Sequence, residues 1–206
     1  MLSLLLLSSL LGLALGCVDK VDNVIRVSDC TPANGFAHFA ELTLLTYDAS
    51  GNPSCGQNSE GKSSGIIHLP GRMFLYSGKV TVAADTPTMN NSKIAYTLGK
   101  HHSWLWAHLC RDGKSVQPLV PDAFCSRDFC SLVGQDICNK LDAHGSFTIQ
   151  DLPAVAKAVI HLPELSGPFA FLKPVLNGDW SLGIKIQLAG GTFAACMLDT
   201  DVPFAS

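Results

Sequence analysis

Residues 178–198 read GDWSLGIKIQLAGGTFAACML, and this stretch decides the fold of the chain. From Trp180 to Leu188 every second side chain is large and apolar, which is typical of a strand with one wet face and one apolar face. Gly190-Gly191 supplies the positive φ angles of a tight hairpin, and Asn177-Gly178 marks a turn on the other side of the strand. The small apolar run after the hairpin predicts a partner strand, which carries Cys196.

Cysteine positions connect this hairpin to the start of the chain. Cys17 and Cys30 are the only cysteines near the beginning, and we interpret the chain as an antiparallel β domain whose last strand is tied to its first by a Cys30–Cys196 disulfide. Short apolar runs between turn residues predict an all-β sandwich or cup. The expected strands before the hairpin cover residues 24–27, 39–47, 66–69, 72–76, 79–84, 93–98, 103–110, 147–149 and 168–175. Residues 154–160 fit either a helix or an edge strand.

The segment 111–139 is irregular and rich in cysteine, and we expect a cross-linked loop with a short helix over Ser126 to Leu132. Its cysteines, with the one just before it, are Cys110, Cys125, Cys130 and Cys138. A zinc site is the alternative use of such residues. An exported chain with an even number of cysteines favours disulfides, and we expect no metal and no cofactor.

Residues 1–16 are rich in leucine, uncharged, and end in small residues, which predicts a signal peptide followed by one domain over residues 17–206. A lipoprotein with an acylated Cys17 is the alternative. The signal predicts a secreted, extracellular or lysosomal protein that is stapled by disulfides. Asn90 begins a glycosylation sequon, Asn90-Asn91-Ser92, so a glycoprotein is expected in a eukaryotic source.

Charge and motifs exclude several classes of function. The formal net charge is −3 and no run of Lys or Arg occurs, so no nucleic-acid partner is expected. The chain contains no nucleophile elbow, no phosphate-binding glycine loop and no zinc helix of the His-Glu-x-x-His type. We therefore expect no enzyme and no catalytic residue. The adjacent His101 and His102 fit solvated loop residues better than metal ligands.

Aromatic side chains are the strongest functional signal. Trp104 and Trp106 share one strand face, Phe169 and Phe171 share another, and Trp180 begins the apolar stripe that also carries Ile184. An ordinary sandwich core accounts for each residue alone. Together they fit a sandwich whose sheets splay apart and expose apolar faces to a ligand. These six residues are the candidates for binding that apolar ligand: Trp104, Trp106, Phe169, Phe171, Trp180 and Ile184.

Several short strings are similar to one known family. They are SGKVTV over residues 77–82, SWLWAHLC over residues 103–110 and GSFTI over residues 145–149, followed by the final hairpin with its cysteine. In this order they resemble the ganglioside-activator group of the ML lipid-recognition family, across residues 29–198. The resemblance implies a β cup with an apolar pocket that takes one lipid out of a bilayer. It also leaves Cys17 and Cys55 without family counterparts, so that they are expected to pair with each other.

The sequence thus predicts an exported lipid-binding and lipid-transfer protein similar to the sphingolipid activators. The expected partners are a lipid ligand (a glycosphingolipid, a phospholipid or a sterol), a transient contact with a membrane surface, and a lipid-processing hydrolase as a further candidate. The first alternative is an extracellular adhesion or immune-recognition domain, stapled by disulfides, with a filled core. A secreted hydrolase is the second.

Overall fold

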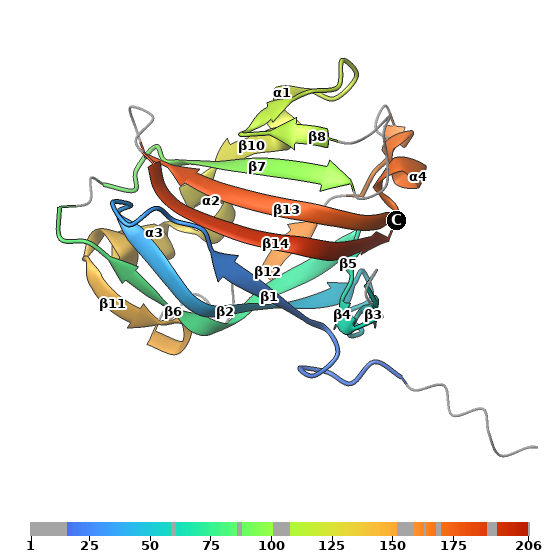
Figure 1. Ribbon diagram of the computed structural model, residues 1–206, viewed down its shortest axis with the longest axis horizontal. Coiled ribbons are helices and arrows are strands. Elements are labelled where there is room, and N and C mark those ends of the chain that lie inside the picture. The colour runs from blue at the N-terminus through green and yellow to red at the C-terminus, as the bar shows by residue number, and fades with distance from the viewer. Residues whose placement is uncertain are drawn as a thin grey trace, which may run out of the picture.

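The computed structural model describes residues 16–205 except 59–60, 86–87, 101–107, 152–158, 163, 168–169 and 189–192. For residues 193–201 only the backbone is described. Antiparallel strands dominate this part of the chain, which confirms the expected fold class. They form two layers that face each other across the middle of the molecule (Figure 1).

The first layer, lower in Figure 1, is built around the long strands β2 and β6. Because β6 pairs with β2 along one edge, the short strands β11 and β12 share its other edge, one at each end. This layer consists of β1 (Val24–Asp29), β2 (Ala37–Asp48), β6 (Gly71–Val82), β11 (Gly145–Thr148) and β12 (Val159–Leu162).

The second layer is centred on the hairpin that the sequence predicted, β13 (Gly178–Gln187) and β14 (Phe193–Ala205). Strand β7 (Lys93–Lys100) pairs with the free edge of β13, and the opposite edge of β7 is shared by β8 and β10. The layer's shorter strands are β5 (Ile67–His68), β8 (His108–Arg111), β9 (Lys114–Ser115) and β10 (Ser126–Asp128). A separate ribbon pairs β3 (Cys55–Gln57) with β4 (Ser63–Gly65).

Strand β1 belongs to both layers. Its first four residues pair with β2, and its last two, Ser28 and Asp29, pair with Leu198 and Met197 of β14. The two layers are therefore joined along one edge through a shared strand.

Short helices close the two ends of the sandwich. Helices α2 (Phe129–Val133) and α3 (Gln135–Asp142) lie at the end near β11, whereas α4 (Leu172–Leu176) lies at the opposite end (Figure 1). The side chain of Asp128 caps α2 by accepting a hydrogen bond of 2.7 Å from the backbone N–H of Ser131. Helix α1 (Asp122–Cys125) and the 3₁₀ helix η1 (Ile149–Asp151) complete the described elements.

Three sequence predictions are wrong in detail. The sequence predicts separate strands over residues 72–76 and 79–84, but β6 runs unbroken through Gly78. Gly78 has a φ of +132°, and its lack of a side chain leaves room for the backbone of Leu42 on the neighbouring strand. The helix expected over Ser126 to Leu132 begins only at Phe129, because the residues before it pair with β7 as β10.

The third correction concerns residues 168–175, which were expected to form a strand. The described part of this segment leads into helix α4 instead, because Leu172 and Leu176 are four residues apart and both are buried on one helical face. Pro174 is tolerated there because it falls in the first turn, where its missing N–H has no helical partner.

Three disulfides lie in the described part of the chain: Cys17–Cys55, Cys110–Cys125 and Cys130–Cys138. The first is the pairing that the sequence predicted for these two cysteines. Cys30 is also disulfide-bonded. The register of β1 on β14, continued by one residue, places Cys30 opposite residue 196. The side chain of Cys196 lies outside the described residues, so the Cys30–Cys196 bridge stays a prediction.

Candidate functional site: an apolar cavity between the layers

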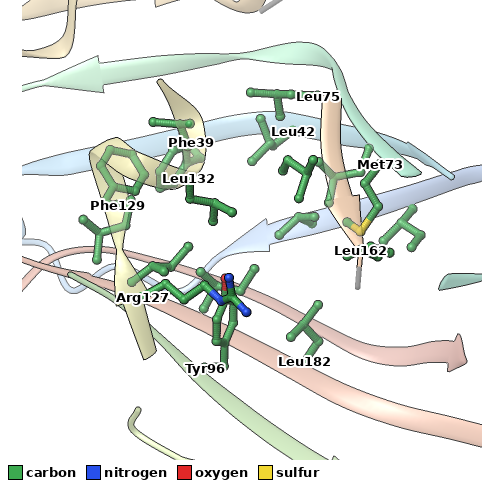
Figure 2. Close-up of a pocket in the computed structure, with 18 of the residues that line it drawn as sticks. Phe39, Leu42, Met73, Leu75, Tyr96, Arg127, Phe129, Leu132, Leu162 and Leu182 are labelled. Atoms are coloured by element: carbon green, nitrogen blue, oxygen red, sulfur yellow. The ribbon is translucent and has the colours of Figure 1, made fainter. Parts of the chain in front are cut away.

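An apolar cavity of about 340 Å³ lies between the two layers. Its walls are the inner faces of both sheets, which supply alternate residues of β1, β2, β6, β7 and β13 (Figure 2). A natural ligand pocket commonly measures about 300–1,000 Å³, so this cavity is large enough for a small ligand.

The wall residues explain why the space is hollow. In a close-packed interior, side chains from facing sheets fill the gap between them. Here Leu75, Tyr96 and Ile184 point inward from their strands but remain only half-buried, because the cavity lies in front of them. The described apolar side chains that line it are Ile25, Val27, Ala37, Phe39, Leu42, Leu44, Ile67, Leu69, Met73, Leu75, Val80, Val82, Met89, Ile94, Leu98, Phe124, Phe129, Leu132, Val133, Ile137, Leu141, Ile149, Ile160, Leu162, Leu176, Leu182, Ile184, Ile186 and Phe204.

The end near β11 is closed by α2 and α3. Phe129 and Leu132 of α2 face the space from that side (Figure 2), and Ile137 and Leu141 of α3 line it as well. The Cys130–Cys138 disulfide ties the two helices together. The cysteine-dense segment therefore forms one end of the cavity, a role that the sequence did not reveal.

The opposite end is closed by a densely packed cluster around Trp180, which we call the Trp180 cluster. Trp180 is completely buried, and its indole Nε1–H donates a hydrogen bond of 2.7 Å to the backbone oxygen of Leu176. The buried members of the Trp180 cluster are Leu69, Leu98, Leu109, Cys110, Val120, Cys125, Leu165, Leu172, Leu176 and Trp180. Some of its members, including Leu98 and Leu176, also line the cavity, so the Trp180 cluster forms this end of the cavity wall.

Polar side chains are rare in the cavity wall. Among the described lining residues only Tyr96, Arg127 and His161 bring a hydroxyl, guanidinium or imidazole group, and no carboxylate is present. Arg127 comes from β10 and reaches inward, with its guanidinium beside the ring of Tyr96 in the view of Figure 2. Burial raises the pKa of the Tyr96 phenol, and the positive charge of Arg127 opposes that rise.

The six predicted lipid-binding residues have different locations. Ile184 lines the cavity. Trp180 packs behind its wall in the Trp180 cluster, and Phe171 is 37% exposed just before α4. Trp104, Trp106 and Phe169 lie outside the described residues, as do His101 and His102. The lipid-binding role of all six stays a prediction.

Other expected features concern modification and metals. Asn90, the glycosylation candidate, is exposed, and its side-chain oxygen accepts a hydrogen bond of 3.2 Å from Gln135. The described residues contain no group of three or more His, Cys, Asp or Glu side chains that could hold a metal ion. Within the same part of the chain, no helix is long and apolar enough to cross a membrane.

Comparisons with known proteins found no match to this chain among protein-family models or among curated proteins. The cavity itself is therefore the strongest guide to function.

Sequence reasoning missed Arg127 and most of the cavity wall. The wall is built from Leu, Ile, Val, Phe and Met, the same residues that fill ordinary cores, so their types carry no signal of a hollow. The distance between the sheets decides whether they pack or leave space, and that distance is not written in local periodicity. For Arg127, the only signal is its position in a short strand between two cysteines.

Proposed function

We propose that this protein binds a lipid in the cavity between its two sheets and carries it between membranes or to another protein. The observation that supports the proposal is an apolar space of about 340 Å³ whose described wall has only three polar side chains. Water finds few hydrogen-bond partners in such a space. Each methylene of an acyl chain that moves from water into it contributes about 0.8 kcal/mol to the free energy of binding. A chain of about ten methylenes offers about 8 kcal/mol before the cost of association is subtracted.

Three disulfides in the described residues indicate an oxidising environment. On that basis we propose that residues 1–16 act as a signal peptide and that the domain works outside the cell or in the lysosome, glycosylated at Asn90 where the host attaches glycans. Extraction of a lipid from a bilayer requires a transient contact with the membrane surface. A lipid-processing hydrolase is the proposed recipient of the cargo, as the resemblance to the ganglioside activators implies.

An adhesion or immune-recognition domain with a filled core is the competing function. The half-buried wall residues Leu75 and Ile184 argue against it, because a filled core would bury them.

Native mass spectrometry of the purified protein, followed by organic extraction, tests the proposal. We expect a mass increment that disappears on extraction, with a lipid in the organic phase. A protein that carries no lipid and takes up none from neutral or anionic vesicles contradicts it.

A further inference from the structure

The described wall of the cavity combines an almost wholly apolar surface with a single arginine, Arg127. Arg127 lies on β10, opposite Ile94 of β7, so the strand pairing fixes its backbone at the edge of the second layer. Arg127 is exposed to solvent, although its side chain also lines the cavity. Arg127 therefore lies where the cavity meets water, with its alkyl stem along the wall.

The guanidinium of Arg127 has no anionic partner among the residues that the structure describes. Within the described part of the chain, no carboxylate lines the cavity and no hydrogen bond or ion pair joins Arg127 to another side chain. Its sequence neighbour Asp128 is already used to cap α2. The charge of Arg127 is thus available to a ligand.

Tyr96 adds a second polar group at the same place. Its ring lines the cavity, the charge of Arg127 acts on its phenol, and its hydroxyl makes no hydrogen bond to a protein group of the described chain. A guanidinium offers a fork of N–H donors that matches a carboxylate or phosphate, and the phenol offers one O–H donor. Together they form a donor site for anionic oxygens.

The volume limits how much hydrocarbon accompanies that group. An apolar cavity of about 150 Å³ holds one benzene molecule, so 340 Å³ holds on the order of a dozen carbon atoms. That is one alkyl chain of moderate length, and it is too small for the two long chains of a diacyl lipid.

We propose that the cavity selects an anionic single-chain amphiphile, with the alkyl chain between the sheets and the carboxylate or phosphate at Arg127 and Tyr96. The inference rests on the proposed lipid-binding function and adds the class of ligand. A fatty acid supplies the anion as a carboxylate, and a lysophospholipid or alkyl phosphate supplies it as a phosphate.

Isothermal titration calorimetry with four probes tests the proposal: dodecanoate, dodecyl phosphate, dodecanol and vesicles of a neutral diacyl phosphatidylcholine. We expect the wild type to bind at least one of the two anionic probes roughly tenfold more tightly than dodecanol. The anionic probe that binds more tightly identifies the source of the charge.

Variants locate the effect. Arg127→Gln should abolish the preference for the anion while leaving dodecanol binding unchanged, Arg127→Lys should keep part of it, and Tyr96→Phe should weaken it by a smaller factor. Lys93→Gln is the matched control, because it removes an exposed cation on the adjacent strand that does not line the cavity. Thermal unfolding curves verify that each variant is folded.

Two kinds of failure are distinguishable. Equal affinity for dodecanoate, dodecyl phosphate and dodecanol, an unchanged anion preference in Arg127→Gln, or tighter uptake of the diacyl lipid overturns the inference and leaves lipid binding intact. Absence of binding by all four probes contradicts the proposed function itself.

Discussion

The two ends of the space between the sheets differ in how they are packed. At one end the Trp180 cluster is filled: Leu172, Leu176 and Trp180 are almost completely buried. Toward the middle, Leu75 of β6 and Ile184 of β13 are only half-buried, because they face the cavity. Both regions are apolar, so composition does not distinguish them.

The two regions use apolar surface in different ways. In the Trp180 cluster each side chain has neighbours on every side, and its contacts stabilise the fold. Around the cavity the fold leaves those contacts unmade, and a ligand can make them. Stability should therefore depend mainly on the first region and binding mainly on the second.

The largest expected effect comes from shortening one leucine in each region. Leu172→Ala in the Trp180 cluster should lower the free energy of unfolding by about 3–5 kcal/mol, because it opens a void in a packed site. Leu75→Ala should lower it by only about 1 kcal/mol, because its side chain already faces open space. Urea unfolding of both variants, without ligand, measures the difference. Equal losses would mean that the two regions are packed alike.

Removal of one disulfide in each region has the next largest effect. A double Cys→Ala variant of Cys110–Cys125, which lies in the Trp180 cluster, should lose about 3 kcal/mol of stability but still bind lipid. The Cys130–Cys138 disulfide closes a shorter loop, so its removal should cost somewhat less stability. Its removal should nevertheless weaken lipid binding, because α2 and α3 are no longer tied together. Unfolding curves and lipid titrations on both variants are required. Weaker binding in the first variant alone would reverse the assignment.

The sequence predicted the strands of the second layer better than it predicted which of their side chains are packed and which face the cavity. The alternation of β13 and the expected partner strand after it identified the antiparallel pair β13–β14 correctly, because side-chain direction in a strand depends only on its own period of two. The expected turn at Gly190-Gly191 lies outside the described residues. The same pattern placed Trp180 and Ile184 on one face of the strand. It did not show that helix α4 covers Trp180, whereas Ile184 faces the cavity. Such differences depend on contacts between residues far apart in the chain.

Gly78 shows a second limit of the sequence. The two strands expected over residues 72–76 and 79–84 leave it in a gap between them. In the fold it lets β6 continue past Leu42, whose Cα lies 2.8 Å from where a β-carbon on residue 78 would be. Only the partner strand shows that the glycine provides space and not a turn.

Filling the cavity should impair binding without loss of the fold. Leu75→Trp places an indole into the space and should weaken lipid binding by at least about tenfold, or 1.4 kcal/mol, while the free energy of unfolding changes little. Leu119→Trp, at a site that is 71% exposed, is the matched control and should bind as the wild type does. Titration calorimetry and urea unfolding give the two quantities. Unchanged binding in Leu75→Trp would place the ligand elsewhere.

The smallest expected effect concerns acid pH at the end of the cavity. The hydrogen bond from Ser131 lowers the pKa of Asp128 below its usual value of 3.8. A lowered pKa in the folded state stabilises the protein above pH 3.8, and this contribution is lost as the pH falls through the folded pKa. Asp128→Asn keeps an oxygen at the cap but does not titrate.

Melting temperatures of wild type and Asp128→Asn at pH 7, pH 5 and pH 3 test this contribution. The difference between the two proteins should stay constant from pH 7 to pH 5 and narrow or reverse at pH 3. Because the carboxylate is exposed, added salt should reduce the difference. A difference that is the same at all three values of pH would contradict the assignment.

The shared strand β1 has a consequence for the order in which the domain forms during synthesis. Strands β1, β2 and β6 lie close together in the sequence and can pair as soon as they leave the ribosome. The link between the two layers has to wait for β14, which pairs with both β1 and β13 and brings residues 28–29 against residues 197–198. This contact encloses nearly the whole domain and is slow to form on entropic grounds. Strands β2 and β6 pack against residues of β7, β13, α2 and α3, all of which follow them in the sequence. The nascent domain therefore exposes the inner faces of β2 and β6 until its later half has been made.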